Sequence, residues 1–131
     1  MTSNHLFVYG TLMRGFDHPI AKLLSRNAGF CGDARCRGRL YLVKHYPGLV
    51  PSDDANDMVH GELYRLHAPE ACFAILDDYE GCGPGLAEPQ YLRQPLAVTR
   101  HDGSVREAWG YVYNRPVTHL KRIQSGRFLG R

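Results

Sequence analysis

Long apolar runs are missing from this chain. No stretch approaches the roughly 20 apolar residues that a membrane-spanning helix needs. The first residues, Met-Thr-Ser-Asn-His, also lack the charged and apolar regions of a secretory signal peptide. We therefore expect a cytoplasmic protein with no membrane partner. The length of 131 residues suits one domain, over residues 1–131, that buries its own core without disulfide or metal support.

Paired metal-ligand and cysteine motifs are missing as well. The four cysteines, at positions 31, 36, 72 and 82, form no CxxC pair, and the scattered histidines form no HExxH motif. In a cytoplasmic chain such cysteines are expected to be reduced thiols. The sequence therefore does not favour a metal site.

The common phosphate-binding and nucleophile motifs are also absent. Gly10 and Gly15 have the spacing of a Walker A loop, but Phe16 and Asp17 follow where Lys and Ser or Thr are required. The glycines at 81, 83 and 85 follow an expected helix, whereas a dinucleotide-binding loop follows a strand. No GxSxG motif is present, so covalent nucleophilic catalysis is not favoured.

An excess of charge is missing too, because the formal net charge is only +3. Arg35, Arg37 and Arg39 would share one face of a strand, and residues 115–131 form a basic C-terminal tail without an acidic residue. We interpret these as a solvated face and a loose tail. An RNA-binding or partner-binding module, with Tyr111 and Tyr113 as stacking platforms, is the less favoured alternative, because alternating tyrosines on a strand are more often core residues.

Hydrophobic patterning predicts the order of the elements. A short buried strand is expected over His5–Val8, and a helix capped by Asp17 is expected to bury Ile20, Leu23 and Leu24. Further strands are expected over 38–43, 59–66, 91–101 and 105–114. Residues 46–48 (YPG) predict a turn, and Asp102-Gly103 predicts a hairpin between the last two strands.

A second helix is expected to begin at Pro69 and to end at Gly81. Its buried stripe is predicted as Cys72, Ile75, Leu76 and Tyr79. Several strands with inserted helices indicate an α+β fold with a mostly antiparallel or mixed sheet that can close as a barrel.

The glycine-bounded segment VYGTLMRG, residues 8–15, follows the first expected strand. Gly10 lets the backbone approach a ligand closely, and successive N–H groups there can receive a carboxylate or a developing oxyanion. A plain tight turn explains the same residues equally well.

The acidic segment LDDYEG, residues 76–81, crowds Asp77, Asp78 and Glu80 at the end of the second expected helix. The helix dipole and mutual repulsion disfavour three carboxylates there. For Asp77 and Asp78 we favour solvated surface positions. Glu80 follows the expected buried Tyr79 and can lie at the mouth of a pocket, where a raised pKa would suit a general base.

Taken together, VYGTLMRG, HGELYRL and LDDYEG resemble the γ-glutamylcyclotransferase-like proteins, and more narrowly the γ-glutamylamine cyclotransferase or AIG2-like branch. The resemblance extends from Phe7 to about Tyr113 and includes YPG at 46–48, YLR at 91–93 and AWGYVY at 108–113. The resemblance implies a small mixed β-barrel with flanking helices. It also implies that Tyr9, Gly10, Thr11 and Leu12 hold the glutamyl group, with Tyr91 lining the pocket.

The reaction implied by the resemblance needs no metal or cofactor. The α-amino group of a γ-glutamyl compound attacks its own γ-carbonyl carbon, which gives 5-oxoproline and a free amine. Glu80 corresponds to the catalytic glutamate of the family and would act as the general acid/base. The small-molecule partner would be a γ-glutamyl amine or amino acid rather than glutathione, because the glutathione-specific branch tends to read YGS. The sequence leaves the leaving amine and the oligomeric state open.

A non-catalytic barrel that binds a small carboxylate is the main alternative to this enzyme. Glu80 separates the two hypotheses, because an enzyme needs its carboxylate as a base, whereas a binding protein could keep its affinity with glutamine at that position.

Overall fold

The computed structural model describes residues 3–10, 12–13, 19–79 and 89–128. In chain order the elements are β1 (His5–Val8), α1 (Pro19–Asn27), β2 (Ala28–Leu42), β3 (Pro47–Pro51), β4 (Met58–Leu66), α2 (Pro69–Tyr79), β5 (Tyr91–Arg100), β6 (Val105–Tyr113) and β7 (Lys121–Ile123). In this part of the chain, neither helix is both long and apolar enough to cross a membrane.

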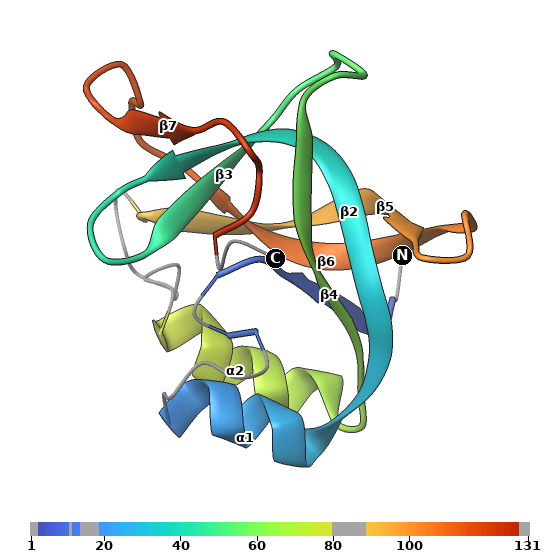
Figure 1. Cartoon of the computed structure of the whole chain (residues 1–131). Helices are drawn as coiled ribbons and strands as arrows, with labels where there is room; N and C mark the ends of the chain where they lie inside the picture. Colours follow the sequence, from blue (N-terminus) through green and yellow to red (C-terminus); the bar gives the residue numbers. More distant parts are fainter. Residues whose placement is uncertain (1–2, 11, 14–18, 80–88, 129–131) are drawn as a thin grey trace.

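The strands form a small mixed barrel. Their order along the sheet is β1-β4-β2-β3-β6-β5, and the additional pairs β1–β6 and β2–β5 close it. Most neighbours are antiparallel, while β1–β6 and β3–β6 are parallel. Helices α1 and α2 lie side by side below the barrel in Figure 1. The predicted α+β fold with a mixed, mostly antiparallel barrel is therefore confirmed.

The long strand β2 shows why the barrel can close. Its pairing with β4 shifts between Phe30 and Asp33, which marks a bulge. Gly32 lies in this bulge with φ 107°, and a Cβ there would come within 2.7 Å of His101. Bulges bend a strand and increase its twist, so β2 can pair with β4, β3, β5 and β7 in turn. The sequence prediction of a strand over 38–43 covered only the end of β2.

Two apolar clusters form the core. One consists of strand residues, including Phe7, Leu49 and Val98, and we place it inside the barrel. The other contains helix residues such as Leu24 and Leu76, together with strand residues that alternate along the chain with those of the first cluster. The alternation of side chains along a strand explains this division. The tyrosines at 111 and 113 are buried, as predicted for core positions.

Some local predictions were wrong. In α2 the buried side chains are Phe73 and Leu76, whereas Ile75 is 45% exposed. The predicted turn at 46–48 is displaced toward the N-terminus, because Pro47 already begins β3. Proline is tolerated at the first residue of a strand.

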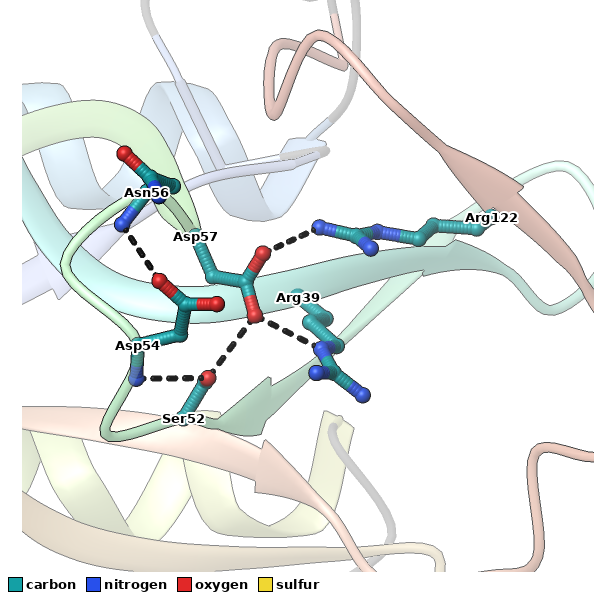
Figure 2. A network of polar contacts seen from close by, with 6 residues as sticks. All are labelled: Arg39, Ser52, Asp54, Asn56, Asp57 and Arg122. Carbon is teal, nitrogen blue, oxygen red and sulfur yellow. Dashed lines mark hydrogen bonds and ion pairs between the residues drawn. The ribbon is translucent and has the colours of Figure 1, made fainter.

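The prediction of a loose basic tail over residues 115–131 is wrong for Lys121–Ile123, which forms β7 and pairs with β2. Figure 2 shows the contacts that hold this segment: Arg122 of β7 donates to Asp57 Oδ1 at 2.7 Å, and Arg39 of β2 donates to Asp57 Oδ2 at 2.7 Å. Ser52 adds a hydrogen bond at 2.8 Å. The hydrogen bond from Arg39, followed by those from Arg122 and Ser52, lowers the pKa of Asp57 well below its ordinary value.

Candidate functional site

A cavity of about 290 Å³ opens where β1 ends, and we call it the β1 cavity. Its lining comes from β1 and the following segment, the start of β3, the end of α2, the start of β5, and β6. The residues are Phe7, Val8, Tyr9, Gly10, Leu12, His45, Tyr46, Pro47, Tyr79, Gln90, Tyr91 and Tyr111. Its volume lies near the lower end of the roughly 300–1,000 Å³ found for small-molecule pockets.

Gly10 is required by the close approach of β3. A Cβ at this position would lie 2.7 Å from Pro47 Cγ and 2.8 Å from Pro47 Cδ. The backbone then turns back, because the Met13 N–H donates to the Gly10 carbonyl at 3.1 Å. The glycine that the sequence indicated as a point of close backbone approach therefore packs against protein on one side and lines the cavity on the other.

Two tyrosine hydroxyls fix the walls of the cavity. The Tyr9 hydroxyl donates to the Tyr111 carbonyl at 2.6 Å and accepts from the Leu49 N–H at 3.1 Å. The Tyr91 hydroxyl donates to the Pro47 carbonyl at 2.6 Å. Both hydroxyls thus bond to backbone, and these bonds tie β1 and β5 to β3 and β6.

The structure brings together four of the residues that the sequence predicted for substrate binding: Tyr9, Gly10, Leu12 and Tyr91 all line the β1 cavity. Thr11 and the predicted general base, Glu80, lie outside the described residues. Tyr79, which directly precedes Glu80, is the last residue of α2 and lines the cavity.

Sequence reasoning assigned no role in binding to one part of the wall. Gln90 Nε2 donates to the Tyr46 hydroxyl at 2.6 Å, and the Asn114 N–H holds the Gln90 carbonyl at 2.9 Å. The exposed His45 ring lies edge-on to Tyr46, with centroids 5.0 Å apart. Only the YPG motif pointed to this region, since the partners come from distant parts of the sequence.

The walls of the β1 cavity carry little charge. Among the described residues that line it, none is Asp, Glu, Lys or Arg. No cluster of metal-binding side chains occurs within the part of the chain that the structure describes.

Asp77 lies behind one wall of the cavity, and its predicted solvated position was wrong. Arg93 of β5 donates to it from Nε at 2.9 Å and from Nη2 at 3.2 Å. The hydroxyl of Tyr111, a lining residue, donates to the same carboxylate at 2.6 Å. Asp78, by contrast, is exposed as predicted.

Comparison with known proteins assigns the family. A family model described as "Gamma-glutamyl cyclotransferase, AIG2-like" matches residues 6–130. The γ-glutamylcyclotransferase family protein YtfP of Escherichia coli (strain K12) is 41% identical over 129 residues, which cover 96% of each chain.

Solved structures agree with this assignment. The solution structure of E. coli ytfP is 38% identical, has a TM-score of 0.64 and is matched over 97% of both chains. The crystal structure of an AIG2-like protein from Mus musculus is 27% identical with a TM-score of 0.71, over 91% of this chain and 82% of that one. This chain therefore belongs to the AIG2-like γ-glutamyl cyclotransferase family.

Proposed function

We propose that the protein cyclises the γ-glutamyl group of a γ-glutamyl amine or amino acid, which releases 5-oxoproline and a free amine. The observation that carries this proposal is the β1 cavity, which is lined both by Tyr9, Gly10 and Leu12 of the glycine segment and by Tyr79 at the end of α2. Membership of the γ-glutamyl cyclotransferase family supports the same reaction class.

The proposed reaction forms one bond and breaks one bond within the substrate. The α-nitrogen loses a proton and attacks the γ-carbonyl carbon, and the five-membered lactam forms as the bond to the leaving nitrogen breaks. The leaving nitrogen takes up the proton. Because both reacting groups belong to one molecule, holding the γ-glutamyl chain folded supplies much of the rate enhancement.

Glu80 is proposed as the group that carries this proton. It directly follows Tyr79, a residue that lines the β1 cavity. The described walls of the cavity offer no acidic side chain as an alternative base. Apolar and aromatic surroundings raise the pKa of a carboxyl group, which suits a general base that works near neutral pH.

The glycine segment is proposed to hold the anionic parts of the substrate. The described lining residues of the cavity include no Lys or Arg to bind a carboxylate, and backbone N–H groups of the glycine segment can donate to it instead. In the proposed complex, backbone N–H groups of the glycine segment donate to the α-carboxylate or to the oxyanion that develops on the γ-carbonyl oxygen.

The test is release of 5-oxoproline from ε-(γ-glutamyl)-lysine, γ-glutamyl-alanine, γ-glutamyl-putrescine and glutathione. The wild type would be compared with Glu80→Gln and with the matched control Asp78→Asn, which changes an exposed carboxylate two residues away. We expect release by the wild type and by Asp78→Asn, and its loss in Glu80→Gln.

A non-catalytic binding protein gives a different pattern. No substrate of the panel would release 5-oxoproline, and Glu80→Gln would bind 5-oxoproline as tightly as the wild type in calorimetry. This result would refute the proposed reaction and leave the family assignment as a statement about the fold.

A further inference from the structure

The carboxylate of Asp77 connects three elements of the fold. It belongs to the last turn of α2, and it accepts hydrogen bonds from Arg93 of β5 and from Tyr111 of β6 at 2.6–3.2 Å. We call these residues the Asp77 network. The side chains of Asp77 and Arg93 are only 20% and 28% exposed. A two-pronged guanidinium–carboxylate pair defines orientation as well as distance.

Aromatic rings fix the orientation of Arg93 further. Its guanidinium carbon lies 4.1 Å from the centroid of the Phe73 ring and 4.9 Å from that of Trp109. Phe73 is on α2 and Trp109 is on β6, so the guanidinium contacts both the helix and the barrel. Such cation–π contacts hold an arginine more tightly when the pair is partly desolvated.

The Asp77 network reaches the β1 cavity at two points. Tyr111 lines the cavity, and its backbone carbonyl accepts the hydroxyl proton of Tyr9, another lining residue. Tyr79 lines the cavity two residues after Asp77, at the end of the same helix. The contacts of the Asp77 carboxylate therefore connect the end of α2 to residues that line the β1 cavity.

The helix by itself does not favour a carboxylate at position 77. The last turn of α2 has no basic residue, and the negative end of the helix dipole disfavours an acid there. The Asp77 carboxylate is stabilised at this position by its partners on β5 and β6. These partners tie the helix end to the cavity wall, which makes a role in positioning testable.

We propose that Asp77, Arg93 and Tyr111 are positioning residues that hold the last turn of α2 against the β1 cavity. This inference rests on the proposed function, because the chain continues from Tyr79 directly to Glu80, the proposed base. The network acts through the helix end and does not contact the substrate through Asp77 or Arg93.

The variant Tyr111→Phe tests the inference, because it keeps the aromatic ring of this lining residue and removes the hydroxyl bound to Asp77. We expect kcat to fall about 10- to 100-fold, since small misplacements of a reacting group have effects of this size. KM is expected to change little, because the glycine segment still holds the substrate. Asp77→Asn should have a similar effect, and the double variant should be no worse than the more damaging single variant, because the residues act as one unit.

Another Asp–Arg cluster in the described part of the chain, around Asp57, supplies a matched control. Arg122→Gln removes an arginine from Asp57, which lies in a cluster none of whose members lines the β1 cavity. It should lower thermal stability while kcat stays at the wild-type value. If Arg122→Gln and Tyr111→Phe lower kcat equally at equal loss of stability, the inference is overturned.

Amide hydrogen exchange in the last turn of α2 gives a readout that needs no turnover. Tyr111→Phe should speed exchange at Leu76 and Tyr79 without affecting α1, and Arg122→Gln should leave the end of α2 unchanged. Unchanged exchange in Tyr111→Phe overturns the inference. Faster exchange with unchanged kcat also overturns it, because the network is then structural only.

The two proposals fail in different ways. A wild type that releases no 5-oxoproline refutes the proposed function. A wild type that turns over while Tyr111→Phe keeps its full kcat refutes the positioning role alone. If Tyr111→Phe does not fold, Arg93→Lys replaces it: this variant keeps the charge but loses the two-pronged geometry, and the same fall in kcat is expected.

Discussion

Replacing Gly10 with alanine tests how the β1 cavity is built. The added Cβ would lie 2.7 Å from Pro47 Cγ, which is roughly 0.8 Å short of the ~3.5 Å at which carbon atoms pack. Pro47 cannot retreat freely, because its ring is rigid and its carbonyl accepts the Tyr91 hydroxyl at 2.6 Å. The start of β3 and the glycine segment must therefore move apart by most of this distance.

The size of the effect follows from this displacement. Overpacking costs about 1–3 kcal/mol, which for a chain of 131 residues lowers Tm by about 4 °C per kcal/mol. A shift approaching 1 Å in the segment proposed to hold the substrate should lower kcat/KM on the order of 100-fold. Gly10→Ala should therefore lose far more activity than its fall in Tm would suggest.

Differential scanning calorimetry and the 5-oxoproline assay measure the two effects. Gly29→Ala is the matched control, because among the described residues a Cβ there meets His67 Nε2 alone, at 3.8 Å, which is an ordinary contact. The double variant Gly10→Ala/Pro47→Ala lacks the two ring carbons that clash and should recover part of both losses. Wild-type Tm and activity in Gly10→Ala, or a double variant no better than the single one, would refute the reasoning.

Three further predictions follow from individual buried groups. Asp57→Asn should destabilise the protein above about pH 4 and progressively less below it, because the stability contributed by a carboxylate with a lowered pKa is lost as pH falls below the ordinary pKa. Urea unfolding at pH 7 and pH 3 tests this, and an equal loss of unfolding free energy at both pH values would contradict it. Tyr9→Phe should lower the free energy of unfolding by about 1–3 kcal/mol, because the buried Leu49 N–H loses its acceptor. An unchanged midpoint of urea unfolding would show that this hydrogen bond does not stabilise the protein. Iodoacetamide at pH 8 should modify Cys31 before Cys36, because burial raises the pKa of the Cys36 thiol to about 12; mass spectrometry that finds Cys36 labelled first would oppose this.

The predictions from sequence succeeded where the pattern is local. The strand over 59–66 and the hairpin at Asp102-Gly103 follow from alternation and from one turn signal, and the structure has them as β4 and the β5–β6 connection. Gly103 has φ 89°, which is the conformation that such a turn demands. The family resemblance also depended on short local motifs, and the family model confirms it.

The predictions failed where the partner lies far away in the sequence. The first part of β2 was missed, because its alternation is interrupted by the bulge near Gly32. Strand β7 has only three residues, and its pairing with β2 gives it a strand conformation. Helical periodicity favoured Ile75 over Phe73, whereas in the structure Phe73 belongs to the buried cluster that contains Leu76.

Part of the candidate site could be predicted from residue types and the family resemblance, but the hydrogen bonds that hold its residues in place could not. Tyr9, Gly10, Leu12 and Tyr91 were predicted and lie together at the β1 cavity. Asp77 was predicted to be solvated, because an acid at the end of a helix is unfavourable without partners. The sequence does not reveal that Arg93 and Tyr111 approach it from two strands. The Gln90–Tyr46 hydrogen bond likewise joins residues 44 positions apart.

The most direct test of the central claim is the identity of the products in ¹⁸O-labelled water, with γ-glutamyl-alanine or the best substrate of the panel. Intramolecular cyclisation predicts equal amounts of 5-oxoproline and free amine, with no ¹⁸O in the 5-oxoproline. Glutamate that carries ¹⁸O would show hydrolysis by water instead and would contradict the proposed reaction, and so would the absence of any product.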